Sequence, residues 1–361
     1  MRETGPPLLL GPRGDETRGS APRSGTISLV FQRAPVRLSL LMGVLLAALL
    51  LSAPLWLTAI GLYHYIGLEI VIWLIYAMGF NLLFGYTGLH SFGHGAYLGV
   101  GAYAFGLFQQ EVAVSLWGGL IAAVAIAGLA GIIVGLFLSH RRGLYFALLS
   151  IAFGQIFWFS AIKMRWLTGG EDGLLNIPRP ELNLIFTKVD LNDNVAFYYF
   201  AAVILLVLVI LLWRLVHSPF GRILQAVRQN EMRASFAGYQ VWRFKLAAFT
   251  ISAMFAGMAG GLLAMAQQSA YPDIMAVHQS GLVVMMVLIG GGLISFWGPV
   301  LGVILYFVAR DVLGGITETW LLWYGLMFVV MVMFRPEGIA GVLQQLKPKS
   351  AKDASIRRQV A

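Results

Sequence analysis

The stretch that decides how this chain is organised reads HSPFGRILQAVRQNEMRASFAGY, from His217 to Tyr239, and it separates two long apolar segments. Ser218 before Pro219 is typical of a helix start, with serine as the N-cap and proline in the first turn. Gly238 is typical of a helix stop. We therefore predict a short amphipathic helix between two membrane spans. Its apolar residues recur at i, i+3, i+4 and i+7, and they are Phe220, Ile223, Leu224 and Val227.

The composition around this stretch is that of a membrane protein. Of the 361 residues, 59% are hydrophobic and 11% are charged, whereas a typical soluble domain has about 25% charged residues. The apolar runs are continuous and long enough to cross a bilayer as helices of about 20 residues each. We therefore predict an all-α fold, a polytopic helical membrane protein in a lipid bilayer. The net charge of +9 follows from basic loops and tails, so it does not indicate a nucleic-acid partner.

About ten transmembrane helices are expected between residues 38 and 343. They are about 38–60, 66–84, a third ending near 109, 114–138, 144–162, 195–216, 246–265, 282–293, 300–312 and 320–334. Residues 1–37 are rich in Pro, Gly, Ser and Arg and are predicted to be a disordered tail, and residues 344–361 form a basic tail. Since basic loops face the cytoplasm, both tails and a coupling loop at about 217–243 are predicted to be cytoplasmic.

A glycine-rich stretch at 85–101 suggests a helix that is interrupted inside the membrane. Irregular backbone at that depth is tolerated only where protein or a cavity covers it, so the stretch could line a transport pathway. The candidate pathway residues are Tyr86, Thr87, His90, Ser91 and His94. The alternative is close helix packing through small residues, because GxxxG spacing recurs at Gly95/Gly99, Gly131/Gly135 and Gly257/Gly261. Two histidines without a further ligand do not predict a metal site.

A faint internal similarity links the two halves of the chain. Ser91-Phe92 and Ser295-Phe296 each follow a glycine cluster, and each is followed by Leu-Gly-Val. Paired interrupted helices in corresponding positions are typical of transporters built from an internal repeat. Chance similarity within glycine-rich apolar sequence is the alternative.

The energy source for transport is predicted to lie outside this chain. The spans carry few ionisable residues and no series of buried carboxylates of the kind that ion-coupled carriers use. The sequence contains no Gly-Lys dipeptide and therefore no Walker A loop for ATP. We predict neither an enzyme nor a bound cofactor. The amphipathic helix at 218–238 could then receive force from a separate motor protein, or it could simply lie on lipid.

Four blocks of sequence carry a resemblance to a known family: FNLLFGYTG from Phe80, YFALL from Tyr145, SPFGR from Ser218 and GGG from Gly290. Together they resemble LivM-type permeases, the membrane subunits of ATP-binding-cassette (ABC) importers for branched-chain amino acids. The resemblance covers about residues 38–345 in order. It implies a bacterial inner-membrane protein with a second permease subunit, two ATPase subunits that bind the ATP, and a periplasmic substrate-binding protein.

The resemblance also implies where the ATPase docks. It assigns the ATPase contact to the region from Glu231 to Gly238. Together with the amphipathic helix, this gives the predicted docking residues of the coupling helix, which are Phe220, Gly221, Arg222, Leu224, Val227, Arg228, Glu231, Ala234 and Gly238. The family commonly has a second small residue beside Ala234, and this chain has Arg233 there. The predicted substrates are branched-chain or other hydrophobic amino acids. Related permeases carry urea and short amides, so these are alternative substrates. An ion-coupled secondary transporter is the alternative from another class.

Overall fold

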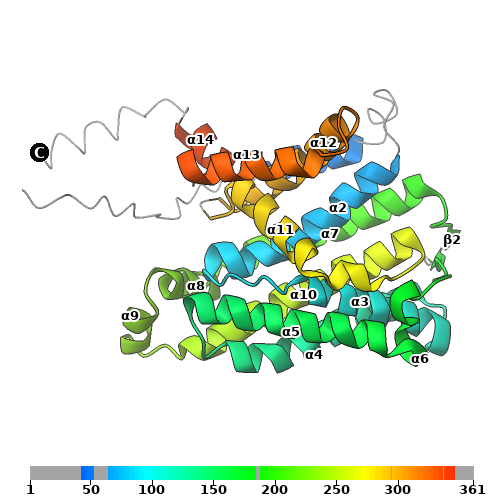
Figure 1. Cartoon of the computed structure of the whole chain (residues 1–361), viewed down its shortest axis with the longest axis horizontal. Helices are drawn as coiled ribbons and strands as arrows, with labels where there is room; N and C mark the ends of the chain where they lie inside the picture. The colour runs from blue at the N-terminus through cyan, green and yellow to red at the C-terminus, as the bar shows by residue number, and fades with distance from the viewer. Residues whose placement is uncertain (1–41, 53–63, 184–187, 294, 336, 346–361) are drawn as a thin grey trace, which may run out of the picture. The chain divides into compact units, whose positions relative to one another are not determined.

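The computed structural model describes residues 42–52, 64–183, 188–293, 295–335 and 337–345 (Figure 1). All of them belong to one compact unit, residues 31–361. The predicted N-terminal tail lies outside the described residues, and so do most of the predicted C-terminal tail and both ends of the first expected span. That span is described as a helix at Met42–Ser52.

Helices make up nearly all of the described chain. The longer ones are α2 (His64–Asn81), α3 (Gly95–Leu107), α4 (Leu116–Leu138), α5 (Gly143–Lys163), α7 (Asn194–His217), α8 (Pro219–Gln229), α10 (Val241–Gln267), α11 (Val277–Gly290), α12 (Gly298–Gly314) and α13 (Trp320–Phe334). The shorter ones are η1 (Leu82–Tyr86), η2 (Phe108–Val112), α6 (Arg165–Thr168), η3 (Gly170–Asp172), α9 (Glu231–Phe236), η4 (Pro272–Met275) and α14 (Gly338–Gln345).

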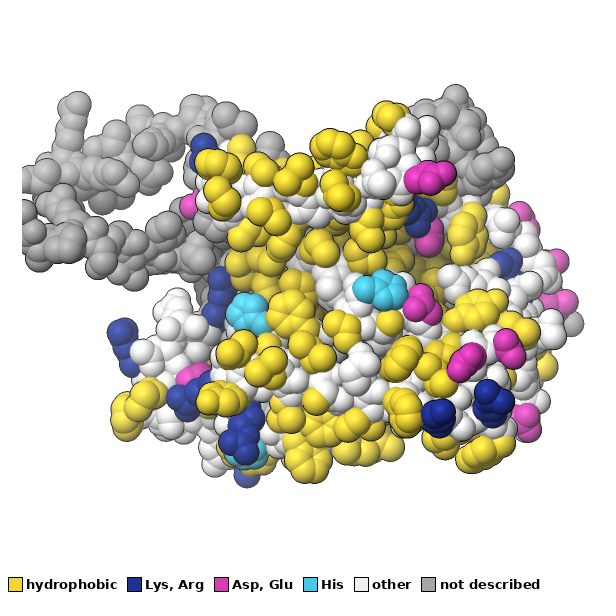
Figure 2. Space-filling model, viewed as in Figure 1, with side chains coloured by type: hydrophobic (Ala, Val, Ile, Leu, Met, Phe, Trp, Pro, Cys, Tyr) yellow, Lys and Arg dark blue, Asp and Glu magenta, His cyan; other side chains and the backbone are white. Residues whose placement is uncertain are grey.

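Five helical segments are long and apolar enough to cross a membrane, which confirms a helical, multi-pass membrane protein. They are 65–86, 116–138, 143–163, 194–217 and 241–267. The outer surfaces of α4, α5 and α7 are apolar, and Figure 2 shows hydrophobic side chains over α5, α11 and α13 on one face. One element departs from the all-α prediction, since β1 (Leu182–Asn183) pairs antiparallel with β2 (Lys188–Val189) in the loop before α7.

Helix α10 is the centre of the packing, and it contacts α2, α3 and α4 (Figure 1). Glycines let these backbones come together, as the sequence spacing suggested. A Cβ atom added at Gly260 would lie 1.9 Å from the Leu98 carbonyl oxygen of α3. One added at Gly257 would lie 2.4 Å from the Cβ of Ala127 in α4. At these positions the small residues serve helix packing.

The helix predicted from Ser218 to Gly238 is two helices, so that prediction is wrong in its extent. Asn230 has an extended backbone that ends α8, and its side chain caps α9 by accepting from the Arg233 N–H at 2.9 Å. The predicted start is confirmed, because Ser218 is the N-cap residue of α8 and Pro219 lies in its first turn. The Ser218 hydroxyl makes no capping bond, however, and donates back to the Leu215 carbonyl at 2.6 Å. Gly238 follows the end of α9 with a positive φ of 88°, as a helix stop requires.

Candidate functional site

The apolar stripe of the polar segment, by which we mean His217–Tyr239, contacts this chain's own helices. Leu224 and Val227 are fully buried, and α8 packs on α7 and α10. The Phe220 ring lies 5.9 Å from the ring of Phe244 in α10. Gly221 is buried as well, and a Cβ there would lie 2.1 Å from the Val216 carbonyl oxygen. These four residues of the predicted dock therefore anchor α8 within the chain.

Glu231, at the start of α9, joins three elements by ion pairs. Its carboxylate lies 2.8 Å from the Lys245 ammonium of α10, and it also pairs with Arg142 from the loop between α4 and α5. The Lys245 side chain is only 2% exposed, and its ammonium also donates to the Arg141 carbonyl at 2.5 Å. This network fixes the start of α9 against α10 and the α4–α5 loop.

Lys245 is the functional residue that the sequence reasoning missed. A lysine at a span end is ordinarily a snorkelling or orientation residue. Lys245 lies beside Glu231 in space because the chain turns between α9 and α10 and brings the start of α10 back to the start of α9. The available signal was a lysine directly before the expected span at 246–265.

The exposed residues of the polar segment lie mostly on α9 and just after it. Phe236 is 85% exposed and Met232 is 57% exposed. Arg222, Arg233 and Gly238 are also exposed, whereas Ala234 is buried. A surface pocket of about 440 Å³ lies between this segment, the α4–α5 loop and the start of α10. Figure 2 shows basic side chains gathered at the side of this face that carries α8 and α9.

Arg228 of α8 is directed toward two other helix ends. Its guanidinium donates to the carbonyl oxygens of Gly85 and Leu293, the latter at 2.8 Å. Burial lowers the pKa of this guanidinium. No carboxylate of the described residues forms an ion pair with it.

Four of the five candidate pathway residues are buried inside the chain. They are Tyr86, Thr87, Ser91 and His94. The His94 ring stacks on Tyr76 at 5.9 Å, and its Nε2 lies 2.9 Å from the Ser252 hydroxyl. His90 alone of the five is exposed, with its ring edge-on to Phe84 at 4.8 Å. Within the described ranges no cluster of residues could hold a metal ion.

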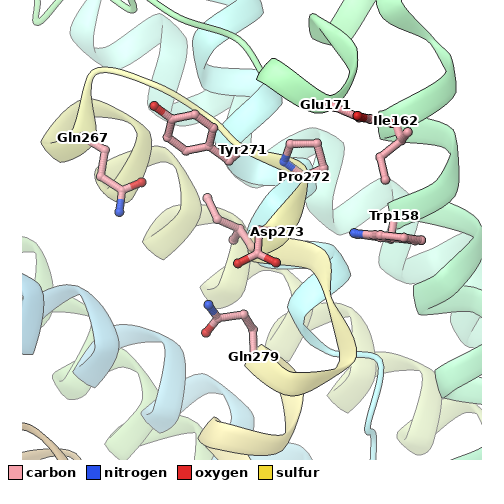
Figure 3. A pocket seen from close by; sticks show the side chains of 9 residues that line it. Trp158, Ile162, Glu171, Gln267, Tyr271, Pro272, Asp273 and Gln279 are labelled. Atoms are coloured by element: carbon pink, nitrogen blue, oxygen red, sulfur yellow. The ribbon is translucent and has the colours of Figure 1, made fainter. Parts of the chain in front are cut away.

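A second pocket, of about 450 Å³, lies at the end of the helices opposite to the polar segment (Figure 3). In Figure 3, Trp158 and Ile162 of α5 face the pocket from one side, and Asp273 and Gln279 face it from the other. Its lining combines apolar side chains, two amides and two carboxylates. The residues are Trp158, Ile162, Glu171, Gln267, Tyr271, Pro272, Asp273, Ile274 and Gln279.

Long apolar helices joined to a polar, ion-paired segment define a multi-pass helical membrane protein. The family model described as the permease component of branched-chain amino acid transport systems matches residues 62–334. The chain therefore belongs to this family of permeases, which is not a class of enzymes, and the resemblance found in the sequence is confirmed.

Curated relatives agree with the family model. The high-affinity branched-chain amino acid transport system permease protein LivM of Salmonella typhimurium is 31% identical, over 78% of this chain and 71% of the relative. LivM of Escherichia coli is 32% identical, over 78% and 70%. A probable LivM of Methanocaldococcus jannaschii is 24% identical, over 77% and 90%. No solved structure matches the chain.

Proposed function

We propose that this chain is the permease subunit of an ABC importer for branched-chain amino acids in a bacterial inner membrane. The partners would be a second permease subunit of the same family, two ATPase subunits that bind the ATP, and a periplasmic substrate-binding protein. The observation that carries the proposal is the exposed Phe236 at the end of α9, a helix held in place by the Glu231 ion pairs. An exposed phenylalanine on a fixed helix is a suitable anchor for a groove on a soluble partner.

The docking face in this proposal is narrower than the sequence suggested. Leu224 and Val227 are covered by the chain itself, so they support α8 rather than contact the ATPase. The contact would be made by Met232, Arg233 and Phe236 on α9, with Gly238 leaving room beside them. No atom lies within 4 Å of a Cβ built at Gly238, so a partner surface can approach the backbone there.

The proposed topology has ten membrane helices with both termini in the cytoplasm. Besides the five long segments, it assigns Met42–Ser52, α3, α11, α12 and α13 to the bilayer. Helix α11, with 14 residues, is about 21 Å long and therefore shorter than a bilayer core of about 30 Å. The α4–α5 loop with Arg142, the polar segment and the C-terminus share the cytoplasmic side under the positive-inside rule.

The second pocket is the proposed entrance for the amino acid from the periplasmic side. A zwitterionic aliphatic amino acid needs a carboxylate for its ammonium group, amide donors for its carboxylate and apolar walls for its side chain. Asp273 can serve the first role, Gln267 and Gln279 the second, and Trp158 and Ile162 the third. Of the pathway residues predicted from sequence, we retain His90, since it is exposed at the helix interruption.

Reconstitution tests the function directly. Uptake of radiolabelled leucine into proteoliposomes is expected to require the ATPase subunits, the binding protein and ATP. A competition series with isoleucine, valine, urea and acetamide identifies the substrate class. Uptake by this chain alone along an ion gradient would refute the proposal, and competition by urea or acetamide instead of the amino acids would refute the assigned substrate.

A further inference from the structure

Arg228 connects α8 with two helix ends that are far apart in the sequence. Its guanidinium donates to the Gly85 carbonyl, in the turn that extends α2, and to the Leu293 carbonyl, 2.8 Å away and just after α11. Carbonyls in the last turn of a helix lack an intrahelical donor and carry the negative end of the helix dipole. A guanidinium has five N–H donors in a planar fork, so one side chain can bond both the last turn of the α2–η1 segment and the turn that follows α11.

The two bonded segments also lie close to each other. A Cβ added at Gly85 would lie 2.6 Å from the Gly292 carbonyl oxygen, and the Asn81 side chain of α2 lies against both glycines. These are the ends that share the glycine cluster followed by Ser91-Phe92 in one half and Ser295-Phe296 in the other. The glycine clusters of the two matching sequences therefore lie next to each other in space, and Arg228 forms a hydrogen bond to each of these two segments.

The surroundings of Arg228 indicate a role beyond filling space. Among the residues that the structure describes, the half-buried Arg228 forms hydrogen bonds to neutral carbonyls and no ion pair with a carboxylate, so it keeps a desolvation cost that such a partner would offset. Its aliphatic stem also supports the interrupted stretch after α2, because a Cβ at Gly88, where φ is +75°, would lie 2.9 Å from the Arg228 Cγ. The helix that carries it, α8, is anchored by Leu224 and Val227, and the single residue Asn230 joins it to α9.

We propose that Arg228 is the positioning residue that couples the polar segment to the pathway. In the resting importer it holds the ends of α2 and α11 together at the cytoplasmic end. When the ATPase moves α9, α8 follows and Arg228 shifts both helix ends as one unit. This inference rests on the importer function proposed above, and it adds the element through which the ATPase would act on the pathway.

The first test compares ATP hydrolysis with uptake in the reconstituted importer. Arg228→Gln is expected to assemble and to hydrolyse ATP, while the leucine taken up per ATP falls by more than about tenfold, because two hydrogen bonds from a charged donor are lost and the loss of one already corresponds to about tenfold. Arg228→Lys should recover part of this ratio, since an ammonium can still reach one carbonyl. The control is Arg214→Gln, an exposed arginine in the last turn of α7, which should keep the wild-type ratio. An unchanged ratio in Arg228→Gln would overturn the proposal.

The second test needs neither a substrate nor an ATPase. The chain contains no cysteine, so a single thiol at the buried Leu89 or at Ser295 reports on one helix end each. In the nucleotide-free permease, Arg228→Gln is expected to raise maleimide labelling of both Leu89→Cys and Ser295→Cys, and Arg214→Gln should raise neither.

The two tests separate the possible failures. If leucine uptake fails in the wild type, the importer function is refuted, whereas the labelling experiment still decides whether Arg228 holds the helix ends. If labelling is the same with and without Arg228, or if it rises at one reporter only, the proposed link between the two ends is refuted. If Arg228→Gln fails to insert into the membrane, the same labelling is measured on Arg228→Lys, which keeps the charge but lacks the forked donor geometry. Labelling of both reporters above the wild-type level supports the link, and wild-type labelling refutes it.

Discussion

Replacing Glu231 by glutamine tests whether the ion pairs at the start of α9 set the strength of ATPase docking. The Glu231 side chain is 15% exposed and Lys245 is 2% exposed, whereas Arg142 is 58% exposed. The Arg142 pair is therefore a surface pair worth about 0–1 kcal/mol. Removing one partner of a fully buried pair costs about 3–5 kcal/mol.

The expected loss lies below that range, because the Lys245 ammonium keeps the Arg141 carbonyl as an acceptor at 2.5 Å and glutamine still offers an amide oxygen. A hydrogen bond to a charged group contributes about 1.5–3 kcal/mol. We therefore expect that α9 loses about 2 kcal/mol of the interaction that fixes it to α10. That energy corresponds to an about thirtyfold weaker association, since 1.4 kcal/mol is a factor of ten.

The assay is the dissociation constant of the ATPase subunit for the permease in nanodiscs, with Glu318→Gln as the control for an exposed glutamate. The double variant Glu231→Gln, Lys245→Met removes both charges and should restore most of the affinity, because no uncompensated charge stays buried. The reasoning would be refuted if Glu231→Gln bound the ATPase like the wild type, or if the double variant bound more weakly than the single one.

Three further predictions follow from exposure and close contacts. Phe236→Asp should abolish co-purification of the ATPase without lowering the melting temperature of the permease, because this ring is 85% exposed; a lower melting temperature would contradict this. Gly260→Leu should prevent stable insertion, since even a Cβ would lie 1.9 Å from the Leu98 carbonyl oxygen, while the control Gly281→Ala, with no atom within 4 Å of its Cβ, should express normally. Asp273→Asn should lower leucine uptake by about tenfold, as expected for the loss of one charged hydrogen bond, with unchanged basal ATP hydrolysis; unchanged uptake would remove Asp273 from the proposed entrance.

Periodicity predicted the helical membrane fold because the apolar runs are long and continuous, and a run of that kind has no alternative inside a bilayer. The same reasoning predicted an amphipathic stripe on α8 but not what the stripe touches. An apolar face looks identical in sequence whether it packs on its own chain or on a partner, so Leu224 was assigned to docking. The break at Asn230 was overlooked for a local reason, since an asparagine within a helical pattern can either face solvent or cap a new helix.

The burial of the α8 stripe gives the docking proposal a mechanical basis. A helix that lay freely on lipid or only on the ATPase would move without carrying the permease with it. Here α8 is packed on α7 and α10, and α9 is bound to α10 and to the α4–α5 loop through Glu231. A displacement imposed on Phe236 would therefore reach the membrane helices by two routes, the Lys245 ion pair to α10 and the Arg228 contacts to the ends of α2 and α11. A permease driven by an external motor requires such connections, because energy released outside the membrane must move the helices within it. Here the two connections link the exposed Phe236 ring to the membrane helices.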